Sequence, residues 1–300
     1  MSIGIKAIVL ALVVGMAIAA QPALTQPPAP QPDPHSFSDS PAETLDSDFW
    51  IADSQDFRAE LLANQISLSE WLEQINQSDL DFLCIGEAHT EIHRQFLAGR
   101  IIPDLKMDVL MLEADPTQVE QIMNAVEAGV EAVGLLGVDI AAIIRAAQAK
   151  NPQLQVIGVD ETRQQSAWRN LEQIRSERRR LSRDGFISQN IRTYFQAGTR
   201  YVALFGAGHC AAYDINLGYS RPFFRHLIRS VVPSEKAKNV RVLSSSQTNS
   251  FRYGMDRAGF SQDTTVIPNT QDIKPTAYNF HWDFKSFLDP YDAIIYFSSP

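Results

Sequence analysis

Two stretches decide the fold of this 300-residue chain: Phe82-Leu83-Cys84-Ile85-Gly86-Glu87-Ala88-His89 and Tyr201-Val202-Ala203-Leu204-Phe205-Gly206-Ala207-Gly208-His209. Each starts with a short apolar run and ends in the pattern G-x-x-H. A run of this length, with no polar alternation, is typical of a strand that is buried on both faces. Glycine at the strand end lets the backbone turn away sharply and leaves space for a ligand. One such pattern is a weak signal, but two at equivalent points of one fold indicate a shared site.

The same organisation continues along the chain, where further apolar runs alternate with stretches of helical periodicity. The expected strands are residues 82–85, 109–112, 154–159, 201–205, 240–243 and 293–297. The expected helices are residues 68–75, 91–105, 116–129, 138–149, 162–182, 186–197 and 220–230. This alternation predicts an α/β fold with a mainly parallel central sheet flanked by helices on both faces. Residues 245–290 are less regular and are expected to form loops over the sheet.

The expected strand ends carry most of the chemically versatile side chains. Glu87 and His89 follow the first strand, Glu113 follows the second and His209 follows the fourth. In open α/β sheets, ligands bind beyond the carboxyl ends of the strands, so we expect the active edge there. Imidazole and carboxylate groups gathered at one edge bind a divalent metal or transfer protons. His89, Glu113 and His209 are therefore the candidate metal ligands.

Other polar residues near these strand ends are ambiguous. Asp160 and Glu161 follow the third strand, where carboxylates also commonly cap helices. His93 lies four residues after His89, on the same face of the expected helix, and is a candidate cofactor ligand. The segment from His89 to His93 has its glutamate in the wrong place for the zinc-protease patterns H-E-x-x-H and H-x-x-E-H.

The first 45 residues are expected to lie outside the fold. Residues 1–20 have the pattern of a secretory signal peptide, with Lys6 before an apolar run and Ala17-Ile18-Ala19 as a cleavage site. The apolar run is shorter than the ~20 residues that a membrane-spanning helix needs, although an uncleaved anchor is the alternative. Residues 21–45 hold seven of the 16 prolines and predict a disordered linker. We therefore expect an exported protein, periplasmic or extracellular, with residues 46–300 as a single domain and no stable membrane span.

Composition narrows the class of protein further. Lys and Arg total 26 against 35 Asp and Glu, a net charge of −9, which disfavours a nucleic acid as partner because phosphate binding needs a basic surface. Two cysteines exclude a disulfide-rich scaffold and a four-cysteine zinc module. In an exported protein Cys84 and Cys210 can pair if the first and fourth strands are neighbours.

These motifs together resemble the superfamily that joins erythromycin esterases, ChaN-like haem-binding proteins and the Tiki/TraB proteins. Ile85–His89 with His93 is similar to the opening G-E-x-H strand and helix, and Leu112-Glu113 to the second-strand glutamate. The resemblance extends to an R-D-x-x-M-A-x-N-I helix, the second G-x-x-H and a closing strand, which correspond to residues 183–191, 205–209 and 291–296 of this chain. Ile187-Ser188 stands in place of the usual Met-Ala. It covers about residues 80–298. The spacing of His89 and His93 leans toward the ChaN-like branch.

The resemblance implies one of two functions. Tiki-type members are metal-dependent proteases that use the G-x-x-H histidines, and erythromycin esterases open a lactone with the counterpart of His89 as general base. The first hypothesis is therefore a metal- or water-activating hydrolase of ester, lactone or amide bonds, acting on a small molecule or peptide. Glu87 or His89 would take the proton of water, because an imidazole with a pKa near ~6.5 is basic at neutral pH. His89, Glu113 and His209 would ligate a metal or orient the water. Arg183 would orient a carboxylate or stabilise the oxyanion, and Asn190 would donate a hydrogen bond.

The alternative is a haem-binding protein involved in haem or iron uptake, as in the ChaN-like branch. The same edge of the sheet would hold haem, with a histidine or tyrosine as axial ligand. His93 and Asn190 are the expected cofactor-binding residues. Aromatic residues that follow the fifth strand favour this alternative, namely Phe251, Tyr253, Phe260, Tyr278, Phe280 and Trp282.

Overall fold

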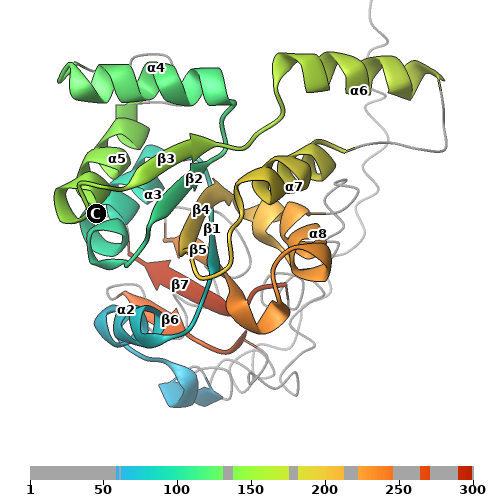
Figure 1. The fold of residues 1–300 in the computed structure, drawn as a ribbon. Helices are drawn as coiled ribbons and strands as arrows, with labels where there is room; N and C mark the ends of the chain where they lie inside the picture. Colours follow the sequence, from blue (N-terminus) through green and yellow to red (C-terminus); the bar gives the residue numbers. More distant parts are fainter. Residues whose placement is uncertain are drawn as a thin grey trace, which may run out of the picture. The chain divides into compact units, whose positions relative to one another are not determined.

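Seven strands form one sheet in the order β3-β2-β4-β1-β5-β7-β6 in this computed structural model (Figure 1). The strands are β1 (Phe82–Glu87), β2 (Val109–Leu112), β3 (Gln155–Gly158), β4 (Tyr201–Gly206), β5 (Ala237–Ser244), β6 (Thr265–Ile267) and β7 (Ala293–Phe297). Neighbouring strands are parallel except β6, which runs antiparallel to β7. The prediction of an α/β fold with a mainly parallel sheet is confirmed.

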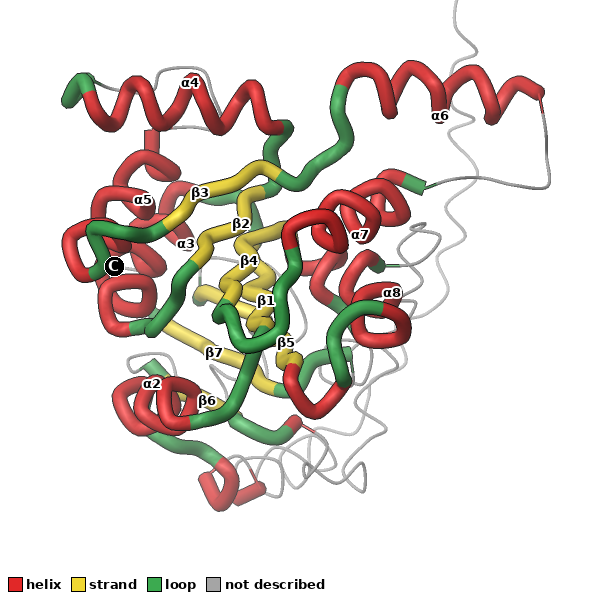
Figure 2. Tube along the Cα trace, in the orientation of Figure 1, coloured by secondary structure: helices red, strands yellow, loops and turns green. Residues whose placement is uncertain are grey.

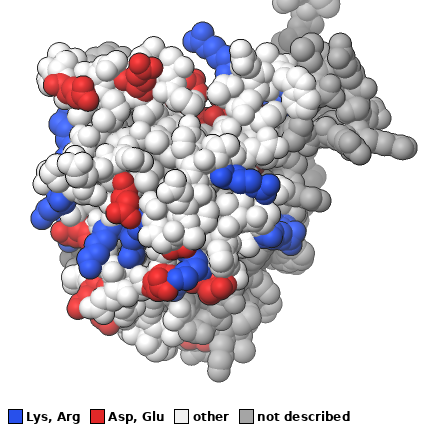
Figure 3. Space-filling model, viewed as in Figure 1, with Lys and Arg blue, Asp and Glu red and all other residues white. Residues whose placement is uncertain are grey.

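The structure describes residues 59–60, 62–130, 138–175, 182–212, 222–245, 264–270 and 290–298. The expected signal peptide, the expected linker and the aromatic residues between 251 and 282 lie outside these ranges. All described residues belong to one compact unit. Within it, no helix has both the length and the apolar character needed to cross a bilayer. On the face drawn in Figure 3, basic and acidic side chains are interspersed.

Helices cover both faces of the sheet (Figures 1 and 2). The helices labelled in Figure 1 are α2 (Leu68–Gln77), α3 (Glu91–Phe96), α4 (Pro116–Glu127), α5 (Val138–Lys150), α6 (Arg163–Arg175), α7 (Arg183–Tyr194) and α8 (Phe223–Ser230), of which α6 stands away from the sheet. The side chains of β1 alternate between two cores: Ile85 packs with α2, α3, α4 and α5, whereas Phe82 packs with α7 and α8. Because both faces are covered, β1 is buried throughout, as its apolar run indicates.

Several helix boundaries differ from the predicted ones. The expected helix 91–105 contains only α3, a π-helical turn η1 (Leu97–Ile101) and a 3-10 turn η2 (Ile102–Asp104), in which Pro103 lacks the N–H of a continuing α-helix. Helix α7 begins at Arg183 rather than at 186, because the Ser182 side chain accepts a hydrogen bond from Gly185 N–H and caps the helix. Helix α8 begins at Phe223, directly after a proline.

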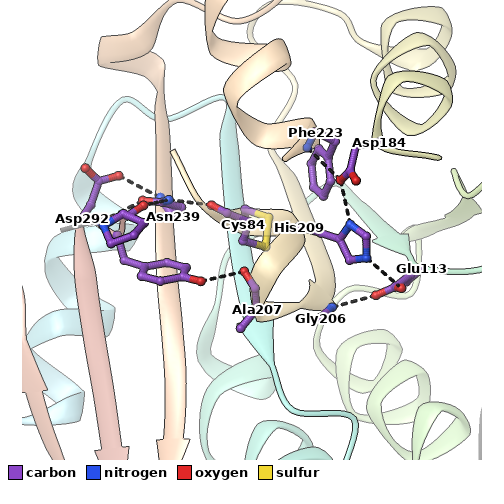
Figure 4. The surroundings of a disulfide bond; sticks show 12 residues. Cys84, Glu113, Asp184, Gly206, Ala207, His209, Phe223, Asn239 and Asp292 are labelled. Carbon is purple, nitrogen blue, oxygen red and sulfur yellow. Dashed lines mark hydrogen bonds and ion pairs between the residues drawn. A yellow bond between two sulfur atoms is a disulfide. The ribbon is translucent and has the colours of Figure 1, made fainter. Parts of the chain in front are cut away.

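A disulfide joins Cys84 of β1 to Cys210 at the end of β4 (Figure 4). The two cysteines meet because β1 and β4 are neighbours in the sheet. Cys210 belongs to the 3-10 turn η3 (Ala207–Cys210), and Asn239 of β5 donates from Nδ2 to the Cys210 backbone oxygen at 2.6 Å. The turn that carries His209 is thus anchored to two neighbouring strands.

Candidate active site

A pocket of about 280 Å³ opens at the carboxyl ends of β1, β2, β3 and β4, at the edge where the sequence predicts the site. Both charged and aliphatic side chains line it. The lining residues are Glu87, His89, Arg94, Leu112, Glu113, Gln118, Ile140, Asp160, Arg183 and Leu204. The topology therefore brings together residues that are up to 117 positions apart in the sequence (from Glu87 to Leu204).

His89 is held between two carboxylates. Its backbone adopts a left-handed conformation, with φ at 56°, which non-glycine residues seldom occupy. Glu87 stabilises this turn, because its carboxylate accepts from the His89 backbone N–H and lies 2.7 Å from Nδ1 of the ring. The other ring nitrogen, Nε2, lies 3.2 Å from Glu113 Oε2. The imidazole is consequently fixed at both nitrogens, while 45% of the side chain remains exposed.

This arrangement changes the protonation state expected for His89. Hydrogen bonds with Glu113 and Glu87 raise the pKa of His89 to about 9, against the opposing effect of burial. Burial would raise the pKa of Glu113, but the hydrogen bond with His89 and the nearby charge of His209 lower it to about 2. His89 is therefore an imidazolium at neutral pH. The expectation of a base that is neutral at this pH used the unperturbed pKa, because the spacing of residues in sequence does not show which carboxylates lie beside the ring.

Glu113 is the centre of the polar cluster. Its Oε2 accepts a hydrogen bond from the Gly206 backbone N–H at 2.7 Å. Its Oε1 accepts from Arg183 Nη2 at 2.7 Å and lies 3.5 Å from His209 Nε2. Residues from β1, β4 and α7 thus converge on one carboxylate that follows β2.

Arg183, the first residue of α7, links Glu113 to the end of β3. Its Nε and Nη2 bind Asp160 in a bidentate pair, at 2.9 and 2.5 Å. The hydrogen bonds to Asp160 are the main reason why the pKa of Arg183 is raised, with Glu113 also contributing. Its Nη1 lies 3.4 Å from His209 Nε2. The guanidinium is therefore a fixed, permanently charged group at the floor of the pocket.

His209 lies between the carboxylates of Asp184 and Glu113 (Figure 4), as His89 lies between those of Glu87 and Glu113. Its Nδ1 lies 2.7 Å from Oδ1 of the buried Asp184, which also accepts from the Phe223 backbone N–H at 2.9 Å. Burial lowers the pKa of His209, but the hydrogen bond and charge of Asp184 raise it overall. Each histidine thus has Nδ1 on a buried carboxylate and directs Nε2 toward Glu113.

The structure places His93 in the core instead of at the pocket. It is fully buried, and its ring contacts Phe297 edge-on. The Ala88 backbone N–H donates to its Nδ1 at 3.4 Å, and its Nε2 lies 3.1 Å from Ser244 Oγ. Burial lowers the pKa of His93 to about 4, so it is neutral at physiological pH. His93 supports the turn before His89 and joins α3 to β5.

Asn190 also has structural partners. Its Nδ2 donates to the backbone oxygens of Val159 and Asp160, at 3.2 and 3.0 Å, and so holds the end of β3 against α7. Sequence reasoning did not single out Arg94, whose Nε lies 3.5 Å from Glu87 Oε1, or Asp184 and Gln118. Asp184 stands next to Arg183 in the first turn of a capped helix, which is a signal that could have identified it.

The polar cluster does not fit a divalent metal. A carboxylate on Nδ1 is the arrangement that orients metal-binding histidines, and both His89 and His209 have it. The guanidinium of Arg183 nevertheless lies within 3.5 Å of both Glu113 and His209, and a positive charge beside two of the three candidate ligands disfavours a second cation there. Across the described ranges, no three His, Cys, Asp or Glu side chains form a metal-binding group.

Haem is not accommodated by the described residues either. His89, His93 and His209 each have both ring nitrogens within 3.5 Å of polar partners, so a histidine that bound iron would first have to give up one of these partners. The pocket volume of about 280 Å³ is also at the lower end for small-molecule sites.

The fold and the polar cluster define an α/β protein with two carboxylate–histidine pairs and one arginine at the carboxyl ends of a parallel sheet. Solved structures share this fold. A succinoglycan biosynthesis protein matches with a TM-score of 0.58 and 10% identity, over 83% of this chain and 98% of its own. A variant of erythromycin esterase EreC in an open conformation matches with a TM-score of 0.50 and 10% identity, over 77% of this chain and 94% of its own.

A Bacillus cereus protein matches likewise, with a TM-score of 0.50 and 10% identity, over 82% of this chain and 97% of its own. No protein-family model matches the chain, and no curated protein matches its sequence. At these identities the likeness concerns the fold. The fold is the one that the resemblance to erythromycin esterases implied.

Proposed function

We propose that this chain is an exported hydrolase that cleaves an ester, lactone or amide bond by direct attack of water. The observation that carries the proposal is the composition of the pocket. It presents imidazole, carboxylates and guanidinium, and none of the described lining residues has a hydroxyl or thiol group. Hydroxyl and thiol groups are the usual nucleophiles of acyl transfer. Water activated by the protein is therefore the nucleophile.

His89 is the general base in this mechanism. It acts in the fraction of molecules whose imidazolium has lost its proton, when Nε2 accepts the proton of the attacking water. Glu87 keeps the other proton on Nδ1 and stabilises the imidazolium as it forms again. Glu113, beside Nε2, orients the water for attack.

Arg183 and His209 form the electrophilic side of the pocket. Negative charge develops on the carbonyl oxygen as water attacks, and fixed positive groups stabilise it without having to reorganise. Arg183 is held in place by Asp160, and His209 by Asp184. The raised pKa of His209 favours its protonated form, which can also donate a proton to the leaving group.

Two further observations support the proposal. The fold is shared with a protein named as an esterase. The disulfide between Cys84 and Cys210 supports export, because such bonds persist in oxidising compartments.

A substrate panel tests this function. The full chain, expressed for export, would be assayed on p-nitrophenyl esters, lactones and peptides, alongside His89→Gln and with or without EDTA. We expect hydrolysis of an ester or lactone that His89→Gln abolishes and EDTA leaves unchanged. No hydrolysis of the panel, or full activity of His89→Gln, would contradict the proposal. Loss of activity with EDTA and recovery with zinc would instead indicate a metal hydrolase, and a saturable Soret band would indicate haem binding.

A further inference from the structure

Gln118 lines the pocket, and the mechanism above gives it no role. It belongs to the first turn of α4, where Asp115 Oδ1 accepts from the Gln118 backbone N–H at 3.0 Å. In return, Oε1 of Gln118 accepts from the Asp115 backbone N–H at 3.0 Å, which completes a capping box. A backbone N–H donates only to an acceptor, so this bond fixes which end of the amide is the oxygen. The Nε2 amino group is therefore the end that stays available.

A second capping box provides a comparison. At the start of α6, Gln165 Oε1 accepts from the Thr162 backbone N–H at 2.8 Å, and Gln165 Nε2 donates to Asn190 Oδ1 at 2.9 Å. For Gln118 Nε2, by contrast, the described residues provide no hydrogen-bond acceptor. The same capping motif thus leaves Gln165 at α6 with both ends of its amide hydrogen-bonded, whereas Gln118 at α4 keeps an Nε2 donor that can bind a ligand.

The surroundings of Gln118 set it apart from the other polar groups of the pocket. Glu87, Glu113 and Asp160 are engaged with His89 and Arg183. Arg94 lies beside Glu87, with its Nε 3.5 Å from Oε1, and the other lining residues are the aliphatic Leu112, Ile140 and Leu204. A donor left without an acceptor when a ligand excludes water costs free energy, so a substrate oxygen is favoured over a methylene at this position.

We propose, on the basis of the hydrolase function above, that Gln118 determines substrate specificity. Its Nε2 donates a hydrogen bond to an acceptor oxygen, a carbonyl or an ether, in the acyl part of the substrate. The hydrocarbon of the acyl part packs against Leu112, Ile140 and Leu204. The preferred substrates are therefore esters or lactones whose acyl chain carries an oxygen acceptor.

Two isosteric esters test this assignment. p-Nitrophenyl methoxyacetate differs from p-nitrophenyl butyrate by one ether oxygen in place of a methylene. The measured quantity is the ratio of kcat/KM for the two esters, because intrinsic differences in reactivity cancel between variants. Gln118→Glu keeps the oxygen that caps α4 and replaces the donor by an acceptor. We expect the ratio to fall on the order of tenfold in Gln118→Glu, with an unchanged melting temperature.

Gln118→Met, which keeps the length and removes both polar groups, should lower the ratio as well and also lower the melting temperature. Gln165→Glu makes the same side-chain change in the capping box outside the pocket. It removes the hydrogen bond to Asn190 and can lower the activity on both esters, but the ratio should stay unchanged. If both esters lose activity in parallel in both Gln118 variants, so that the ratio stays within about twofold, Gln118 is only a helix cap and the proposal is wrong.

A binding measurement separates this proposal from the hydrolase function. Methoxyacetanilide and butyranilide, whose amide bonds are far less reactive than the p-nitrophenyl esters, would be titrated by ligand-observed NMR. If no ester is hydrolysed but wild type prefers methoxyacetanilide and Gln118→Glu loses that preference, the hydrolase function fails and the recognition stands. Equal affinity for the two anilides in wild type and both variants would overturn the role of Gln118, as would the absence of saturable binding.

Discussion

Gly206 lies so close to the His89 ring that a side chain would not fit at position 206, since a Cβ atom there would lie 2.6 Å from Nε2 of His89. Gly206 has an ordinary backbone conformation, with φ at −55°, so the close approach of the imidazole explains the glycine. The relationship is reciprocal, because a Cβ at Gly86 would lie 2.8 Å from the Cα of Ala207. The glycine of each G-x-x-H motif makes room for the other motif, which explains why the two occur together.

Gly206→Ala should therefore inactivate the site while the fold persists. The new methyl group would push the His89 ring away from Glu113, and a displacement of about 1 Å in a catalytic group costs on the order of 100-fold in rate. The measurement is kcat/KM together with the circular dichroism spectrum. Gly99→Ala is the matched control, because a Cβ there meets nothing within 4 Å. Wild-type activity of Gly206→Ala would show that His89 does not need its present position.

The pH dependence of activity follows from the raised pKa of His89. Only the neutral imidazole accepts a proton, so kcat/KM should rise with pH and level off above about 9. Glu113→Gln removes the largest cause of the shift, and the titration midpoint of the His89 ring, followed by NMR, should move to lower pH. A midpoint near 6.5 in wild type would contradict the arrangement of carboxylates around the ring.

Stability should change over the same pH range. Because the pKa of His89 is raised in the folded state, its interactions stabilise the protein fully below about 6.5 and are lost as the pH rises through about 9. The free energy of unfolding of wild type should therefore fall between these values more steeply than that of His89→Ala. Denaturant titrations at several pH values measure the difference. Parallel curves for the two proteins would rule out this contribution.

Arg183→Lys should lower kcat even though it keeps the positive charge. Lysine cannot reproduce the bidentate pair with Asp160 while also reaching Glu113, so the charge is no longer fixed where the oxyanion forms. We expect a loss on the order of 10²-fold. Arg169→Lys is the control, because Arg169 makes the same bidentate pair with Glu161 but does not line the pocket. Equal effects of the two substitutions would assign Arg183 a structural role.

Removing the disulfide should destabilise the protein strongly. The bond closes a segment with a sequence separation of 126 residues, for which the chain-entropy relation gives about 5 kcal/mol. The double variant Cys84→Ala, Cys210→Ala should unfold at a clearly lower denaturant concentration than wild type. Because Cys210 adjoins His209, kcat should fall too, by more than in a variant destabilised elsewhere. An unchanged unfolding midpoint would show that the hydrogen bond from Asn239 is sufficient to hold the turn.

Much of the architecture could be predicted from local patterns. Continuous apolar runs predict strands buried on both faces, and all six expected runs correspond to strands of the sheet. The short antiparallel strand β6 was missed, because it lies in a stretch with little periodicity and is stabilised by pairing with β7. Helix boundaries were less accurate where a cap such as Ser182 or a proline such as Pro103 decides the end.

In the candidate site, too, the positions of residues along the chain could be predicted, whereas their charge states and orientations could not. The sequence by itself placed Glu87, His89, Glu113 and His209 at strand ends, because the order of strands and helices dictates which residues reach the carboxyl edge. The tertiary structure alone decided that His89 is charged and that His93, four residues later, faces the core. Charge states depend on through-space distances of about 3 Å between groups from different strands, and periodicity along the chain carries no information about those distances.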